Sequence, residues 1–304
     1  MKKAIVTGAN GFIGSHVVKE LVEHGIEVLA IDLPECYGNI PKNENVKFLG
    51  MDIFSLPDNA DKIDVNYYDT FYHFAWVGSA GEKRIDYDLQ MQNALCTVEC
   101  IKTAKQLGCE RFVCAGSIME KEVVAAVSSQ GSRPGMGYIY GMGKLIAHCM
   151  SKSVAAEQGI DLIWAIITNA YGPGELSPRF VNTTIRKIIN GEPLQFTAAT
   201  QNYDFIYIDD IARAFRLLGE SGTPFNEYVL GSGKAKPLKE FITEMTDSLC
   251  PDITPVFGDV PFTGVDLPSD TFSIKAIEKD CSFFPEVSFA EGTRITMEWL
   301  KGER

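Results

Sequence analysis

Short apolar runs alternate with helix-like segments along the first half of the chain. Ile13, Val17, Leu21 and Val22 recur at helical intervals and form one apolar face, and Gly25 follows as the expected end of that helix. Longer helices are expected over residues 86–107 and 138–158. Runs rich in β-branched and aromatic residues predict strands at 3–8, 27–32, 46–51, 70–75, 111–116 and 161–167. Strands that alternate with helices predict an α/β fold with a doubly wound parallel sheet.

The pattern changes after about residue 168. Turn-rich pieces such as NAYGPGELSPRF at 169–180 and VPFTGVDLPSD at 260–270 are separated by shorter periodic segments. This texture predicts a smaller, irregular domain beside the sheet. The crevice between the two parts is the expected ligand site.

Composition and charge exclude several classes of protein. The chain has 304 residues, a formal net charge of −12 and a sequence pI near 4.9, which argues against a nucleic-acid partner. Its N-terminal apolar run, AIV at 4–6, is too short for a signal peptide or a membrane span. The eight cysteines form no CxxC pair, and the four histidines show no metal-ligand spacing. We therefore expect a cytoplasmic, reduced protein that uses no metal and contacts no membrane.

Three glycines, Gly8, Gly11 and Gly14, stand between the first expected strand and the first expected helix. Such a loop turns sharply, lets its backbone approach a pyrophosphate and points the free N–H groups of the helix at the anion. A purely structural loop would use glycine too, but the spacing directly after a strand favours dinucleotide binding.

Acidic residues end the next two expected strands. Asp32 can accept hydrogen bonds from the adenosine ribose and would repel a 2′-phosphate, and the first basic residue after it is Lys42. This favours NAD over NADP. Asp52 either meets the adenine amino group or is an exposed acid at a strand end. His73 lies in an expected buried strand and is interpreted as a hydrogen-bonded core histidine.

Tyr140 and Lys144 are four residues apart, so a helix places them on one face. Ser117 ends the fifth expected strand, at the sheet edge where a nicotinamide would lie. The lysine charge favours the phenolate form of the tyrosine, and the serine hydroxyl can donate to the reacting oxygen. We interpret Ser117, Tyr140 and Lys144 as the catalytic set. The pair alone could also be two polar residues on a surface helix.

With these motifs in order, the chain resembles the extended short-chain dehydrogenase/reductase family, the NAD-dependent sugar epimerase/dehydratase group, over nearly its whole length. NALCTVECIKTAKQLG at 93–108 resembles the family helix with an asparagine near the cofactor, Asn93. TNAYGPG at 168–174 resembles the segment whose asparagine, Asn169, lines the substrate site. YDFIYIDDIARAF at 203–215 resembles the segment that returns the chain to the first domain, and FPEVSFAEGTRITMEWL at 284–300 resembles the C-terminal helix.

The resemblance implies a Rossmann-type NAD-binding domain at 1–168, with 203–220 returning to it. It also implies a substrate domain at 169–202 and 221–304, a nucleotide-sugar substrate and a homodimer built on the helices around 86–107 and 138–158. The residues that it implies at the cofactor are Gly8, Asn10, Gly11, Phe12, Ile13, Gly14, Asp32, Asp52, Ile53, Phe74, Ala75, Asn93, Tyr140 and Lys144. Those that it implies at the substrate are Asn169, Arg179 and Tyr203.

The departures from the family narrow the reaction. Family 4,6-dehydratases carry a Thr-Asp-Glu triplet where this chain has Ser117, Ile118 and Met119, so dehydration is not expected. The bifunctional epimerase-reductases have a cysteine where Ile118 stands. Two readings stay open: an NAD-dependent epimerase, and an NAD(P)H-dependent 4-ketosugar reductase or dehydrogenase. A non-catalytic dinucleotide sensor is a third, although such proteins commonly lose the tyrosine or the lysine.

Arginines that usually clamp the substrate diphosphate are missing. Tyr203 occupies one family position, the stretch 261–270 contains no arginine at the second, and Ile166 replaces an arginine before the NAYGP segment. An arginine fork matches a diphosphate in geometry and charge. Candidates for compensation are Arg179, Arg186 and Arg133, unless the substrate carries no diphosphate.

Overall fold

A parallel sheet forms the centre of the molecule. The computed structural model describes residues 1–63, 68–258, 260–262 and 264–302, and within these the sheet has seven strands in the order β11-β6-β5-β4-β1-β2-β3. Every neighbouring pair runs parallel. The strands are β1 (Lys3–Thr7), β2 (Glu27–Asp32), β3 (Val46–Gly50), β4 (Thr70–His73), β5 (Arg111–Ser117), β6 (Asp161–Ile167) and β11 (Glu227–Leu230). The predicted α/β fold with a doubly wound sheet is confirmed.

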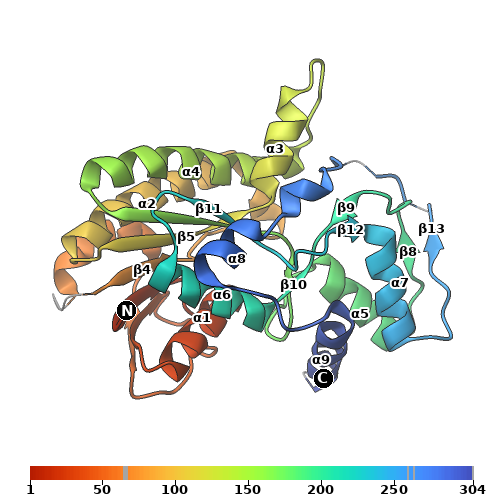
Figure 1. Cartoon of the computed structure of the whole chain (residues 1–304), viewed down its shortest axis with the longest axis horizontal. Coiled ribbons are helices and arrows are strands. Elements are labelled where there is room, and N and C mark those ends of the chain that lie inside the picture. The colour runs from red at the N-terminus through yellow and green to blue at the C-terminus, as the bar shows by residue number, and fades with distance from the viewer. Residues whose placement is uncertain (64–67, 259, 263, 303–304) are drawn as a thin grey trace.

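Helices cover both faces of this sheet (Figure 1). On one face α2 (Tyr87–Gln106) and α4 (Ile139–Gln158) pack side by side, and on the other α1 (Phe12–Glu23) packs against α6 (Ile208–Ser221). The apolar stripe of α1 is buried at Val17, Val18 and Leu21. The Asp86 side chain caps α2 by accepting a hydrogen bond from the Leu89 N–H at 3.1 Å. Both faces of the sheet are therefore buried, as all-parallel sheets require.

The return to the sheet extends further along the chain than expected. The family resemblance ended it at residue 220, but β11 pairs in parallel with β6 from Glu227↔Trp164 to Leu230↔Ile167. Helix α8 (Lys275–Cys281) packs against both α6 and β11. Part of the stretch 221–304 thus belongs to the sheet domain. The backbone N–H and C=O groups along the edge of β6 need hydrogen-bond partners, and β11 provides them.

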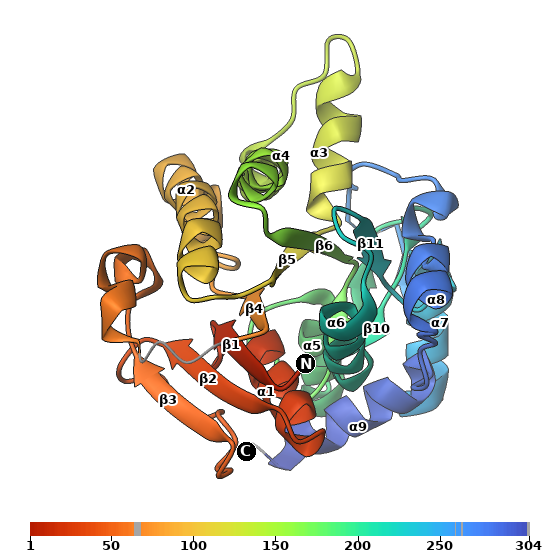
Figure 2. The same cartoon turned by 60° about the vertical axis from the view of Figure 1, so that its left-hand side comes forward.

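The smaller part is built around aromatic side chains. Phe205 contacts Phe241 and Phe289, with ring centroids 5.0 and 5.1 Å apart. Its helices are α5 (Phe180–Asn190), α7 (Leu238–Leu249) and α9 (Phe289–Gly302), and they lie together at one end of the molecule in Figure 1. Figure 2 shows α7 on the side of the molecule opposite β3. Its two-residue strands are β7 (Ala170–Tyr171), β8 (Gln195–Phe196), β9 (Asn202–Tyr203), β10 (Ile206–Tyr207), β12 (Lys236–Pro237) and β13 (Val256–Phe257).

Short elements connect these parts. Helix α3 (Met119–Ser128) follows β5 directly, and its far end projects from the body of the molecule (Figure 1). The 3₁₀ turns are η1 (Ile53–Ser55), η2 (Pro57–Lys62), η3 (Glu82–Ile85), η4 (Met136–Tyr138) and η5 (Ser269–Phe272). Among the helices described, none is both long and apolar enough to cross a membrane.

The strand order reverses between β1 and β4. Consecutive strands β1, β2 and β3 extend to one side, whereas β4, β5 and β6 extend to the other. Loops that leave the carboxyl ends of β1 and β4 diverge at this point and open a crevice, which is where open α/β sheets bind ligands.

Candidate active site

The glycine loop occupies this switch point with little free space. Gly8 has φ of +69°, and a Cβ there would lie 2.6 Å from the Ala75 nitrogen after β4. A Cβ on Gly14 would lie 2.0 Å from the Gly8 carbonyl oxygen. Only glycine allows the first turn of α1 to sit this close to β1 and β4. The first turn of α1 contains no acidic residue, so its N–H groups face the crevice without a competing carboxylate.

Asp32 is held firmly at the end of β2. One carboxylate oxygen accepts the Asn10 N–H at 2.8 Å and the other accepts the Leu33 N–H at 2.8 Å. Asn10 in turn binds Asn39 through both its side-chain and backbone oxygens. These contacts orient the carboxylate beside the glycine loop, and both oxygens keep lone pairs for a ligand.

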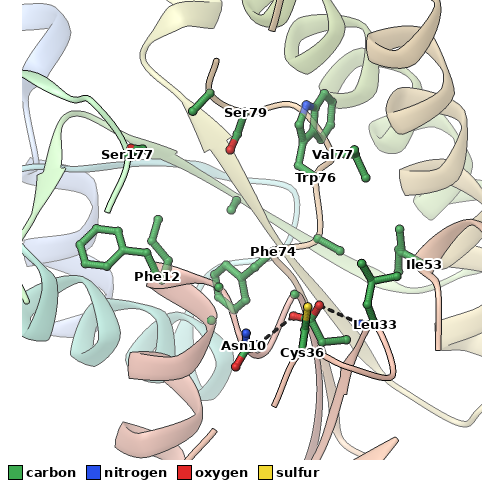
Figure 3. Close-up of a pocket in the computed structure, with 18 of the residues that line it drawn as sticks. Asn10, Phe12, Leu33, Cys36, Ile53, Phe74, Trp76, Val77, Ser79 and Ser177 are labelled. Carbon is green, nitrogen blue, oxygen red and sulfur yellow. Dashed lines mark hydrogen bonds between the residues drawn. The ribbon is translucent and has the colours of Figure 1, made fainter. Parts of the chain in front are cut away.

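A cavity of about 650 Å³ runs from Asp32 across the glycine loop to Tyr140 and Lys144. Asn10, Leu33 and Cys36 lie at one end and Trp76 and Ser79 at the other (Figure 3). Its size is in the range typical of small-molecule sites. Among the lining residues are Gly8, Asn10, Gly11, Phe12, Ile13, Gly14, Asp32, Asp52, Ile53, Phe74, Ala75, Tyr140, Lys144 and Arg179, all of which the sequence singled out.

Tyr140 and Lys144 project from α4 into the far end of this cavity. Lys144 is 4% exposed, and its Nζ donates to the Ala115 carbonyl of β5 at 2.7 Å while lying 3.8 Å from the centre of the Trp76 ring. The Trp76 and Tyr140 rings meet edge to face with their centroids 6.1 Å apart. The Arg84 guanidinium carbon lies 4.5 Å from the centre of the Tyr140 ring. The Arg84 cation therefore lies directly over the buried phenol, whereas the Lys144 cation lies over the adjacent Trp76 ring.

Four predicted residues, Ser117, Asn93, Asn169 and Tyr203, do not line the cavity. Ser117 ends β5, and its Oγ accepts the Met119 N–H at 3.3 Å. Asn93 grips the chain after β4, accepting the Val77 N–H and donating to the Val77 carbonyl, each at 2.9 Å. Asn169 donates to the Asp204 carbonyl at 2.9 Å. Asn93 and Asn169 thus shape the segments that form the site.

The candidate substrate residues differ in their surroundings. Arg179 lines the cavity, and its Nε lies 3.2 Å from the Glu175 carboxylate, which the Ser177 N–H and hydroxyl also bind. Arg186 donates to Asn182 at 2.8 Å. The positive charge of Arg179 is therefore already matched by a neighbouring carboxylate.

Two of the uncertain residues have clear environments. His73 is buried and lies between the hydroxyls of Thr7 and Thr97, at 3.0 and 3.2 Å, and burial lowers its pKa to about 3. It is a neutral core histidine, as interpreted from the sequence. Asp52 caps η1 through the Phe54 N–H at 3.0 Å and also lines the cavity.

Beside Tyr140 lies a cluster of titratable residues, of which the sequence singled out only Tyr203. Arg84 comes from η3, Glu122 from α3, Tyr138 from η4 and Tyr203 from β9, and their charges act on one another. Burial raises the pKa of Glu122 to about 7 against the opposing Arg84 cation, and raises the pKa of Tyr203 to about 12. No motif joins these residues, because they meet only through the packing of four separate segments.

The sequence is similar to those of known proteins over most of its length. The model of the NAD dependent epimerase/dehydratase family matches residues 4–231. A probable dTDP-glucose 4,6-dehydratase of Sinorhizobium fredii is 24% identical over 98% of this chain and 92% of its own length. A dTDP-4-dehydro-6-deoxyglucose reductase of Escherichia coli is 26% identical over 78% of this chain and 79% of its own.

The fold agrees with a solved relative. The UDP-N-acetylglucosamine 4-epimerase of Methanobrevibacter ruminantium M1 superimposes with a TM-score of 0.79 at 24% identity, covering 100% of this chain and 99% of that one. These three relatives are named for three different reactions, so similarity alone does not choose among them. The family match spans the glycine loop, helix α4 with Tyr140 and Lys144, and strand β11. The chain therefore belongs to the NAD-dependent epimerase/dehydratase family, within the extended short-chain dehydrogenases/reductases.

Proposed function

We propose that this enzyme is an NAD-dependent nucleotide-sugar epimerase. The observation that carries the proposal is the position of Tyr140 and Lys144, which close the far end of the cavity that begins at the glycine loop and Asp32. When bound, NAD supplies the hydride acceptor and donor.

The residues present suit this cofactor. Gly8 and Gly14 leave no room for a Cβ, as expected where a backbone must approach a pyrophosphate beneath a helix N-terminus. The fixed carboxylate of Asp32 would bind the two ribose hydroxyls and repel a 2′-phosphate. These features favour NAD over NADP.

Tyr140 would exchange a proton with the sugar oxygen at the reacting carbon. The buried Lys144 ammonium and the Arg84 guanidinium would both offset the negative charge that develops on the reacting oxygens during proton transfer. Ser117 would donate a hydrogen bond to the same oxygen, using the hydroxyl proton that its bond to Met119 leaves free.

Dehydration needs a further acid and base, and the residues after Ser117 do not offer them. Ile118 and Met119 carry no titratable group. The next carboxylate, Glu120, is 1% exposed and accepts hydrogen bonds from Ser117, His148 and Trp164. A carboxylate engaged in this way is not free to transfer protons at the sugar.

The test combines cofactor analysis with a substrate panel. We expect denatured protein to release about one NAD per chain, and a panel of UDP- and dTDP-sugars to yield one epimer pair with no net change at 340 nm. Tyr140→Phe should lower the rate by about 10²- to 10⁴-fold and leave NAD binding nearly intact. Empty protein that instead consumes NADH or NADPH with a 4-ketosugar would replace the epimerase with the reductase.

We also propose a homodimer built on α2 and α4. Tyr87, Met91 and Leu95 are 61, 40 and 55% exposed and follow one another at four-residue intervals on α2, so they share a face. Cys149 is exposed on the adjacent helix α4. Aligned apolar side chains of this size are typical of a protein interface.

A further inference from the structure

Behind the end of β5 lies a buried polar cluster that the proposed reaction does not use. Glu120, His148 and Trp164 are 1, 8 and 0% exposed. The His148 and Trp164 rings stack with centroids 4.4 Å apart and 3° between their planes. His148 Nδ1 lies 3.0 Å from a Glu120 oxygen, and Trp164 Nε1 donates to both oxygens at 3.1 and 3.2 Å. One carboxylate therefore joins α3, α4 and β6.

The same carboxylate binds the backbone of Ser117. The Ser117 N–H donates to Glu120 Oε1 at 2.8 Å. The next residue toward the N-terminus, Gly116, is confined by the cluster, since a Cβ there would lie 2.3 Å from Trp164 Nε1 and 2.8 Å from Glu120 Oε1. On the other side, Lys144 Nζ binds the Ala115 carbonyl at 2.7 Å. The backbone of residues 115–117, at the end of β5, is thus held on one side by Glu120 and on the other by Lys144.

The burial of the Glu120 carboxylate is energetically costly. Moving an ionised carboxyl group out of water is costly unless donors satisfy it, and an apolar residue would fill the same space at lower cost. Glu120 accepts from three donors, of which only one, the Ser117 N–H, belongs to a predicted catalytic residue. A second carboxylate, Glu227, lies 3.8 Å from His148 Nδ1 and pairs with Lys121 at 2.6 Å.

We infer that Glu120 is a positioning residue for Ser117. By holding the Ser117 N–H, with His148 and Trp164 fixing its own carboxylate, Glu120 sets the direction in which the serine hydroxyl donates to the substrate oxygen. The inference rests on the proposed function, in which Ser117 is that donor. Glu120 is 1% exposed and its carboxylate is engaged by Ser117, His148 and Trp164, so it acts only through the backbone that it holds.

The test is a double-mutant cycle with Ser117→Ala. Glu120→Met leaves Ser117 N–H without its acceptor and should lower kcat about tenfold, with KM and NAD affinity within about twofold. Glu120→Gln keeps an oxygen for that N–H and should restore most of the rate. In the Ser117→Ala background, where no hydroxyl remains to be oriented, Glu120→Met should change kcat less than about twofold. If Glu120→Met instead lowers kcat by the same factor with and without the Ser117 hydroxyl, the inference is overturned.

A matched control separates positioning from general damage. Asp210 is another buried acid that accepts backbone N–H groups, those of Glu286 and Val287, at 2.9 and 3.0 Å. Asp210→Asn should lower thermal stability without the kcat pattern of Glu120→Met. If Glu120→Met does not fold, Glu120→Gln and His148→Phe enter the same cycle, and His148→Phe should give a loss that likewise disappears with Ser117→Ala.

A second readout does not depend on turnover. Hydrogen–deuterium exchange should rise in the peptide 115–119 of Glu120→Met and stay unchanged in β4. If the wild type epimerises no nucleotide sugar, the proposed function fails, and the exchange result still decides whether Glu120 fixes Ser117. Unchanged exchange in 115–119 would overturn the positioning role even in an active enzyme.

Discussion

Glu122→Gln should change how folding stability depends on pH. Glu122 lies in the first turn of α3, where burial raises the pKa of its carboxyl group from 4.5 to about 7 against the opposing charge of Arg84. Between these values the folded protein holds a proton that the unfolded chain has released. The carboxyl group therefore stabilises the fold fully below about pH 4.5, and this contribution is lost as the pH rises through about 7.

The size of the effect follows from the shift. One pKa unit corresponds to about 1.4 kcal/mol, so the full shift would be worth about 3 kcal/mol. Glu122 is only partly buried, and solvent screening reduces this to about 1–2 kcal/mol. Glutamine has the shape of the protonated acid and no proton to lose, so the variant should escape the loss.

Urea unfolding near pH 5 and near pH 8.5 measures the effect directly. The free energy of unfolding of Glu122→Gln, relative to wild type, should rise by about 1–2 kcal/mol between these two pH values. Glu157→Gln, on an exposed position of α4, is the matched control and should run parallel to wild type. If the Glu122→Gln curve also runs parallel to wild type, the buried carboxyl does not carry the raised pKa.

Three further predictions concern the cofactor and the interface. Gly14→Ala places a Cβ 2.0 Å from the Gly8 oxygen, so the loop must shift. NAD affinity measured by titration calorimetry should fall at least about tenfold, the order of magnitude of one lost close contact to the pyrophosphate. Unchanged affinity would mean that the loop does not hold the phosphates. Asp32→Ala should weaken NAD binding by about 10- to 100-fold and reduce the preference over NADP, followed through tryptophan fluorescence, since Trp76 lines the cavity. An unchanged preference would assign ribose recognition elsewhere. Leu95→Glu should convert a dimer to a monomer in light scattering, whereas Lys19→Glu, at an exposed position of α1 on the opposite face of the sheet, should not, and a dimer that survives Leu95→Glu would exclude the α2 face.

The main sheet could be predicted in large part because its strands are buried on both faces. β1, β2, β5 and β6 read as continuous apolar runs, which is the pattern of an all-parallel sheet. β11 escaped because it is a four-residue edge strand, EYVL, with alternating burial inside a turn-rich region. Periodicity alone does not distinguish such a segment from a loop. Its assignment to the sheet depends on the partner edge of β6.

That the glycine loop, Asp32 and the residues after β4 lie together could also be predicted, for a topological reason. The glycine loop, Asp32 and the residues after β4 all follow the carboxyl ends of parallel strands, and those ends meet at one edge of the sheet. Order along the chain is therefore enough to bring them together. Asn93 shows the limit, because order along the chain does not reveal that its side chain binds the backbone of Val77, a residue of the cavity wall.

The substrate end depends on contacts that no linear pattern records. A position-by-position reading notes that Tyr203 stands where relatives have an arginine, and concludes that a positive charge is missing. In the folded chain Arg84 approaches from η3, and its charge acts on the Tyr203 phenol while its guanidinium covers Tyr140. The cation is thus present at this end but comes from a different element, and Glu122 lies close enough to oppose it. Charge at a binding site is a property of the assembled surface, so the loss of one arginine in a motif does not by itself argue for an uncharged substrate.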